Sequence, residues 1–531
     1  MVKLWCVMTL LLLFVSKGFA QQTETATADP QYVSEVLAEL DAAGSPATDA
    51  EIAEFLEASR RPARGYWLVR SGWLAEVGWD ASSRMRWSEE KFFLRGKWRR
   101  SRDGIAVSGA VAGFVWGKAR LAAGQVGIDQ GFGLVAAGPG RGPALTADGR
   151  LGAHSRGLIL WGGAAEAQTL LGGAAEWVTP RWQLRVVAGR RAINWDQLEG
   201  TEKVTVASQG VLSGGDGQIS VLGVSDAAEK SLSLAGNWRR GRADGSWEVA
   251  WRRSKNSAVP WRGWLSQVGW RPHASLYLEC LLGWADEGPR PVLGQKHPVL
   301  GDWSGQGVAV RGTWRLAQGL GVKALVHSGQ AGALGIDRRE HKSLFDLQLV
   351  KQWPGRWRIE ARWRRNATED EAFSERFPWQ PATLFGRDNR EITSFKVGWE
   401  NEKNRLRFAW RRLVLARVRQ DLGWESGGAR QMGTITGGAA IGRGGYLRAG
   451  WTWSWGDPVD LVSAVVPFTG YVLPRHWGHW RSETHLGVEW PWGPLEAHFA
   501  VSRRRPEAPE RGSNDPTPDS WAGWLEWVWH W

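Results

Sequence analysis

The feature that most constrains this chain is a two-residue alternation of apolar and polar side chains, repeated from about Arg70 to the last residue. In RWRIEARWRR, Trp357, Ile359, Ala361 and Trp363 alternate with Arg and Glu side chains. Successive side chains of an extended chain point to opposite faces, so the spacing predicts strands with one apolar face. The same spacing recurs in residues 182–188, 232–238, 247–251, 276–284, 308–316, 447–455, 486–492 and 525–531. So many segments, joined by turns, indicate an all-β fold.

The length of these segments favours a membrane barrel over a soluble sheet packed on a core. They run for about 9 to 14 residues, whereas a tilted transmembrane strand needs about 9 to 11 and a soluble strand about 5 to 6. The chain after residue 20 contains no apolar run of about 18 residues, which excludes spanning helices. Only a closed barrel satisfies every backbone donor and acceptor in lipid. We therefore predict a transmembrane antiparallel meander β-barrel.

Turn residues and long polar connections predict two different rims. Tight turns are expected at residues 243–245, 354–355, 444–445 and 492–494, and long connections begin at Asp286, Asn366 and Arg505. A meander with one periplasmic and one external rim has this arrangement. At roughly 20 to 24 residues per strand and connector, we predict about 18 to 24 strands.

The N-terminal part is predicted to be an export signal followed by a short helical element. Residues 1–20 have a basic start, an apolar run and small residues at Gly18 and Ala20, which is typical of a cleaved signal peptide. Residues 21–66 are predicted to be a periplasmic linker, in which Thr48 and Glu51 form a capping box for the second of two short helices. This element is either a plain appendage or a docking site for a periplasmic partner. The barrel is predicted over residues 67–531.

Charge and cysteine content agree with an exported protein. The net charge is +13, and it becomes 13 − 2 = +11 without Lys3 and Lys17 of the signal. A basic surface suits anionic lipid or simply solubility, and we expect no nucleic-acid partner. Without Cys6 of the signal, Cys280 is the single cysteine, so no intramolecular disulfide framework is expected.

The polar faces of the predicted strands carry many arginines. If they face a wide lumen, their fields would favour anions in a water-filled passage. Alternatively, they pair with carboxylates across the wall and fill the interior. The candidate pore-lining residues are Arg252, Arg311, Arg315, Arg356, Arg358, Glu360, Arg362, Arg364, Arg407 and Arg448.

The apolar faces carry indoles near the strand ends, and the chain has 39 Trp but only 5 Tyr. Amphipathic rings favour a membrane interface. The candidate interface residues are Trp363, Trp451, Trp453, Trp455, Trp490, Trp492, Trp527, Trp529 and Trp531. The last strand resembles the C-terminal signature of bacterial outer-membrane barrels, in which the final aromatic residue is recognised by the barrel-assembly machinery. Trp531 stands where that signature usually has Phe, and the resemblance makes it the candidate assembly signal.

An internal segment suggests a family. Residues 119–142, ARLAAGQVGIDQGFGLVAAGPGRG, are similar to the "GDY…FGQGL" segment of bacterial outer-membrane barrel proteins with an N-terminal helix-hairpin-helix region. Residues 27–62 also resemble the acidic helical lead-in of that family, although the Asn-Thr-Ala-rich hairpin that would follow is missing. The resemblance implies an outer-membrane barrel and supplies no catalytic residues. The positions that match in outline are Gly124, Gln125, Gly127, Gly131, Gly133 and Leu134.

Two motifs could carry chemistry. The glycines of GQVGIDQGFG lack the Lys-Ser or Lys-Thr of a phosphate-binding loop, so we interpret them as allowing tight turns and close strand packing. In PRHWGHWRSETH, polar residues gather that could form a hydrolase or metal site only if the fold aligned them. Those residues are His476, His479, Ser482, Glu483 and His485.

The functional hypotheses follow from the fold. We predict a non-enzymatic outer-membrane barrel with no cofactor or metal, acting as a passive or anion-preferring pore or as a structural barrel. The alternatives are a surface-binding barrel whose long loops engage a polysaccharide or protein, and a barrel hydrolase that uses His476, His479 or Ser482.

Overall fold

The computed structural model describes residues 65–530 except for several gaps. The gaps are 75–77, 89–90, 102–103, 133, 137–156, 161–168, 192–203, 256–259, 287–304, 334–335, 355, 373–382, 402, 420–423, 443, 458–461, 469–470, 477–479, 494 and 507–518. The predicted signal peptide, both N-terminal helices and Trp531 lie outside the described residues, so they stay predictions. Among the described residues, no helix is long and apolar enough to cross a bilayer.

The described elements are strands, as the two-residue spacing predicts. Their bounds are β1 Gly65–Leu74, β2 Gly78–Ser88, β3 Phe92–Ser101, β4 Gly104–Trp116, β5 Ala119–Asp129, β6 Gly157–Leu160, β7 Leu170–Val178, β8 Trp182–Arg191, β9 Val204–Gly214, β10 Gly217–Ser225, β11 Glu229–Arg240, β12 Ala243–Ser254, β13 Trp261–His273, β14 Leu276–Ala285, β15 Gly305–Ala317, β16 Leu320–Ala333, β17 Ile336–Gln352, β18 Trp357–Ala372, β19 Thr383–Glu400, β20 Asn404–Arg419, β21 Trp424–Ile441, β22 Gly445–Gly456, β23 Val462–Phe468, β24 Tyr471–His476, β25 Trp480–Trp492, β26 Leu495–Pro506 and β27 Ser520–His530.

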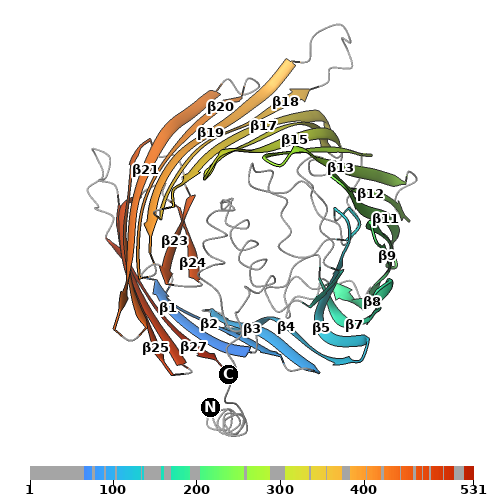
Figure 1. Ribbon diagram of the computed structural model, residues 1–531, viewed down its shortest axis with the longest axis horizontal. Helices are drawn as coiled ribbons and strands as arrows, with labels where there is room; N and C mark the ends of the chain where they lie inside the picture. Colours follow the sequence, from blue (N-terminus) through green and yellow to red (C-terminus); the bar gives the residue numbers. More distant parts are fainter. Residues whose placement is uncertain are drawn as a thin grey trace.

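The strands form an antiparallel meander that closes on itself (Figure 1). Within the described residues, 25 strands belong to one sheet, and β27 pairs with β1 over the register Tyr66↔His530 to Leu74↔Ala522. Strand β22 pairs with β25, because β23 and β24 form a separate hairpin that lies inside the ring in Figure 1. The prediction of an all-β antiparallel meander is confirmed.

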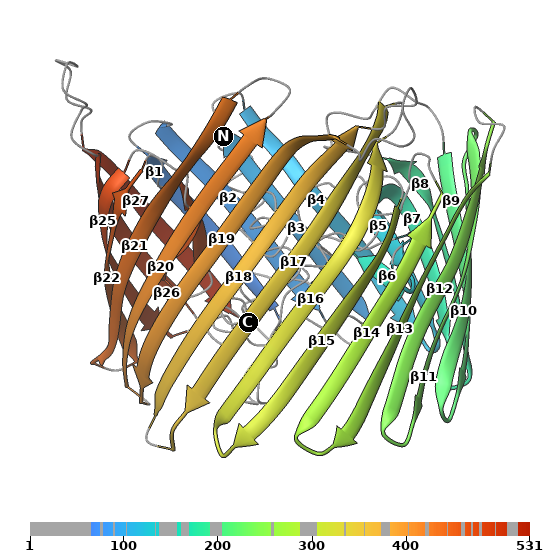
Figure 2. The ribbon, with the colours of Figure 1, turned by 90° about the horizontal axis from the view of Figure 1, so that it is seen from above.

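The two rims differ in the length of their connections. Strand β1 begins and β27 ends at the same rim, since Tyr66 pairs with His530. On that rim each connection between successive strands spans two to four residues, and the tight hairpins lie at the lower edge of the barrel in Figure 2. The long connections between β14 and β15 and between β26 and β27 belong to the opposite rim. The turn predicted at 243–245 is wrong by two residues: Gly241, at φ 58°, forms it, and Ala243 already belongs to β12.

The two faces of the wall separate by side-chain type. Large apolar side chains on the outward face are exposed, such as Trp251 at 44% and Val310 at 48%, while their neighbours Ala250 and Arg311 on the inward face are buried. This period-two change along each strand gives the closed sheet an apolar exterior. We call these two faces inward and outward.

Candidate functional site

The distinctive feature of the interior is the way β5 leaves the wall. Strand β4 pairs with β5 only as far as Gly124, and β7 pairs with it as far as Val126. Gly124 has a φ of 120°, and a Cβ atom there would lie 2.3 Å from the carbonyl oxygen of Ala110. Only glycine fits such a backbone at such a close approach. Beyond it β5 continues inward, paired with β6, to Asp129, which is fully buried.

The chain then turns back inside the ring, and we call residues 130–132 and 134–136 the inner turn. The backbone N–H of Gln130 donates to the carbonyl of Ala136 at 3.2 Å, and Gly131 takes a φ of 55°. Phe132 and Leu134 are buried at 3% and 4% exposure. The glycine-rich motif therefore makes a turn, as predicted from the sequence, but the turn lies in the lumen and not at a rim.

A buried carboxylate on the wall holds the inner turn. Glu248 of β12 is fully buried, and its Oε2 accepts hydrogen bonds from the backbone N–H groups of Phe132 at 2.6 Å and Leu134 at 3.3 Å. Its other oxygen accepts from the Ser233 hydroxyl at 2.7 Å. Hydrogen bonds to a charged acceptor are worth about 1.5–3 kcal/mol each, so this carboxylate is a strong anchor.

Further polar groups extend this anchor along the wall. The Gln130 side-chain amide donates to the carbonyl and hydroxyl oxygens of Ser233 at 3.2 and 3.0 Å, and its Oε1 accepts from Gln209 at 3.0 Å. Arg185 donates to Gln209 at 2.8 Å and to Glu176 at 2.6 Å. We call Glu176, Arg185, Gln209, Ser233 and Glu248 the anchor network; it links β7, β8, β9, β11 and β12 to the inner turn.

Apolar side chains on the inward face complete the packing on this side of the barrel. They accompany the inward charged groups that the sequence pattern predicts, such as Arg252 and Arg311. Strands there carry apolar residues on both faces, for example Leu281 inside and Leu282 outside. The buried cluster contains Phe132, Leu134, Val135, Ala136, Leu158, Leu160, Val187, Ala207, Leu222, Ala250, Leu265, Leu281, Ala309, Leu325 and Leu344.

Most of the predicted pore-lining arginines face inward and pair with carboxylates on the wall. Arg311 donates to Glu279 at 2.6 Å, and Arg362 donates to the fully buried Asp346 at 2.8 Å. The remaining pairs are Arg252 with Glu229 at 3.4 Å, Arg358 with Glu360 at 3.3 Å, Arg407 with Glu400 at 3.3 Å and Arg448 with Glu489 at 3.4 Å. Because these pairs are buried, removal of one partner would leave an uncompensated charge inside the protein and destabilise the fold.

Other predicted residues have different surroundings. Arg364 donates to the neutral Asn366 side chain at 3.2 Å, and Arg315 is exposed near the short-turn end of β15. Arg356, also predicted to line the pore, lies instead in the turn between β17 and β18, with a positive φ of 75°. Arg430, which the sequence pattern did not single out, is fully buried and donates to the Ser454 hydroxyl and the Trp480 carbonyl at 2.8 and 2.9 Å.

The predicted interface indoles that are described all lie on the outward face. Trp453 stacks between Trp451 and Trp455, with ring centroids 4.6 and 6.4 Å apart. At the end of the chain Trp527 and Trp529 alternate with the buried Glu526 and Val528. The exposed members are Trp363, Trp451, Trp455, Trp490, Trp492, Trp527 and Trp529.

The histidine-rich segment is divided between two sheets. His476 ends β24 of the inner hairpin, Ser482 belongs to β25 of the barrel, and His479 lies outside the described residues. Glu483 and His485 face inward and are buried, at 0% and 5% exposure. Within the described part of the chain, no group of three or more His, Cys, Asp or Glu side chains could hold a metal ion.

Comparison with known proteins gives only distant structural likeness. No protein-family model matches the chain, and no curated protein matches it. It is similar to the FrpB iron transporter from Neisseria meningitidis (F5-1 variant), with a TM-score of 0.47, 8% identity and coverage of 90% of this chain and 83% of that one. It is also similar to the siderophore receptor PirA from Acinetobacter baumannii, with a TM-score of 0.48, 8% identity and coverage of 89% and 81%. The P pilus usher (PapC) translocation pore gives a TM-score of 0.43, 8% identity and coverage of 88% and 98%. These values are too low to assign any property of those proteins to this chain.

Proposed function

We propose that this protein is a β-barrel of the bacterial outer membrane, in contact with lipid over its outward face. The support is the apolar exterior of a closed sheet, with exposed Val, Leu and Trp side chains on strand after strand. If the four-residue β6 is not counted, 24 of the 25 described strands of the sheet remain. This number is even, as in bacterial outer-membrane barrels. A soluble protein rarely exposes so large an apolar surface.

Within that barrel we propose a passage for small hydrophilic solutes, with the inner turn as its constriction. The observation that carries this proposal is the hydrogen bonding of the inner turn to Glu248, inside the ring. Segments that enter a barrel lumen narrow it. Because polar bonds hold the inner turn to one wall, its release would widen the passage without unfolding the barrel.

The passage is proposed to favour anions moderately. Most of the predicted pore-lining arginines are paired, so their fields are largely cancelled at a distance. Strands β18 to β22 nevertheless carry 15 Arg and Lys side chains and 8 Asp and Glu side chains. This excess of positive charge is the part of the wall that would attract an anion.

Two further assignments are proposals that depend on the outer-membrane location. The C-terminal strand is proposed to be the signal for the barrel-assembly machinery, supported by its outward Trp527 and Trp529 and by its closing contact with β1. The proposed kinship with helix-hairpin-helix barrel proteins is supported by the motif of residues 119–142, part of which forms the inner turn. The N-terminal residues are proposed to lie in the periplasm, where they could meet a partner.

The direct test is conductance of the refolded protein in a planar bilayer under a salt gradient. We expect discrete current steps and a reversal potential whose sign and size indicate a modest preference for anions. A barrel that is folded, as judged by heat-modifiable migration in gels, but never conducts would refute the passage. Recovery of the protein in a soluble fraction without detergent would refute the membrane location.

A further inference from the structure

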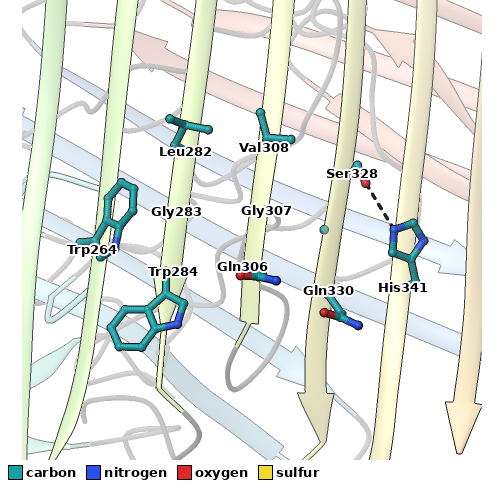
Figure 3. Close-up of a pocket in the computed structure, with 11 residues that line it drawn as sticks. Trp264, Leu282, Gly283, Trp284, Gln306, Gly307, Val308, Ser328, Gln330 and His341 are labelled. Atoms are coloured by element: carbon teal, nitrogen blue, oxygen red, sulfur yellow. Dashed lines mark hydrogen bonds between the residues drawn. The ribbon is translucent and has the colours of Figure 1, made fainter. Parts of the chain in front are cut away.

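We infer that a groove on the outward face of β13 to β17 binds the sugar headgroup of a glycolipid in the outer leaflet. This inference rests on the proposed membrane location. The groove has a volume of about 480 Å³, and its polar side chains come from three neighbouring strands. Figure 3 shows Leu282 and Val308 toward one end and Gln306 and Gln330 toward the other.

The backbone forms the floor of the groove. Gly283, Gly307 and Gly329 pair in register across β14, β15 and β16 at inward positions, so their backbone lies between two rows of outward side chains. The flanking residues on these strands point outward and form the sides of the groove.

The groove lies at the height where a lipid headgroup begins. Ser328 and Gln330 are eight and ten residues along β16 from Leu320, at the short-turn rim. At a rise of about 3.3 Å per residue and a tilt of about 45°, they lie roughly 19 and 23 Å above that rim. The apolar band of an outer-membrane barrel is about 25 Å tall, so these groups lie near its far edge. Below them Val326 continues the apolar surface at 50% exposure.

The chemistry of the lining favours a sugar over a phosphate. Two amides, a hydroxyl and an imidazole supply both donors and acceptors; Ser328 Oγ and His341 Nε2 lie 3.3 Å apart. Among the lining residues that the structure describes there is no Arg or Lys, and these are the usual partners of phosphate. Trp264 and Trp284 add flat apolar surface beside the polar groups, which suits the C–H face of a sugar ring. The acyl chains of the same molecule would lie along Leu282 and Val308.

The test compares two lipids with the same acyl chains. The full-length protein is placed in nanodiscs that contain diglucosyl diacylglycerol and phosphatidylglycerol in equal amounts, and the lipids retained are read by native mass spectrometry. We expect preferential retention of the glycolipid, reduced about tenfold in the S328L/Q330L double variant, which loses two sets of hydrogen bonds. Leucine suits a lipid-facing surface, so this variant should insert as the wild type does. The control S208L makes a similar change at another exposed outward serine, on β9, and should retain the glycolipid.

Each outcome has one meaning. Equal retention of both lipids by the wild type, or equal glycolipid retention by S328L/Q330L and the wild type, overturns the inference and leaves the membrane barrel intact. Failure of the wild type to enter nanodiscs refutes the proposed function itself. Preferential retention lost only in the double variant supports the groove.

Discussion

Replacement of Glu248 by Gln should release the inner turn and increase channel opening. Glutamine keeps the size of the side chain, but only its carbonyl oxygen can accept a hydrogen bond. If that oxygen accepts from Phe132 and Leu134, the amide nitrogen faces Ser233 and the bond from the Ser233 hydroxyl is lost; the negative charge that strengthens all three bonds is lost as well. The loss of one charge-assisted bond is worth about 1.5–3 kcal/mol. At about 1.4 kcal/mol per factor of ten, the ratio of released to held inner turn rises about 10- to 100-fold.

The assay is the open probability of single channels in planar bilayers, for the wild type, E248Q and E248A. Alanine leaves both buried N–H groups without this acceptor, at about 1–3 kcal/mol for each, so E248A should open more often than E248Q. Glu279→Gln is the control, because Glu279 is also an inward, buried carboxylate but it bonds to Arg311 and Tyr277. Equal open probabilities for wild type and both Glu248 variants would show that the anchor does not gate the lumen.

Three other changes test separate parts of the structure. Gly131→Ala should displace the inner turn, since φ is 55° at this residue and the new Cβ atom would lie 2.7 Å from Glu248 Oε2. We expect faster proteolysis of the folded barrel. A cleavage pattern equal to that of the wild type would contradict this prediction. Val310→Arg places a charge on the outward face of β15 and should destabilise the barrel by about 2–4 kcal/mol in urea unfolding from lipid vesicles; a loss below about 0.5 kcal/mol would argue against lipid contact there. Arg362→Met leaves Asp346 buried without this partner and should lower the free energy of unfolding by about 3–5 kcal/mol. The R362M/D346L double variant should recover this stability. If it does not, loss of the ion pair is not the cause of the destabilisation.

The fold was largely predictable from the sequence because each strand carries its own two-residue pattern. Trp357 and Trp363 point outward and Glu360 and Arg362 inward, as the alternation requires. A turn depends on a few backbone angles, so its position was less certain. The hairpin predicted at 243–245 turns at Gly241 instead.

The interior was less predictable, because it depends on contacts between residues far apart in sequence. Nothing near Glu248 indicates that it bonds to Phe132, 116 residues earlier. The sequence nevertheless contained a signal, because some strands carry apolar residues on both faces, as in the neighbours Val221 and Leu222 or Leu281 and Leu282. Apolar residues on both faces indicate that the inner face of the wall is also packed against other parts of the chain. Isolated arginines could not be assigned to partners, since a strand pattern gives the face but not the register.

The lumen has two unlike halves, and this separates what controls its width from what controls its selectivity. The inner turn belongs to the buried apolar cluster and is held by the anchor network on β7 to β12, whereas the excess of Arg and Lys side chains lies on β18 to β22. Releasing the inner turn changes the first half and leaves the charges of the second in place. E248Q should therefore raise the open probability while its reversal potential stays that of the wild type. A reversal potential that moves toward stronger anion preference in E248Q, which lacks the negative charge of Glu248, would mean that the anchor residues, and not the basic strands, determine which ions pass.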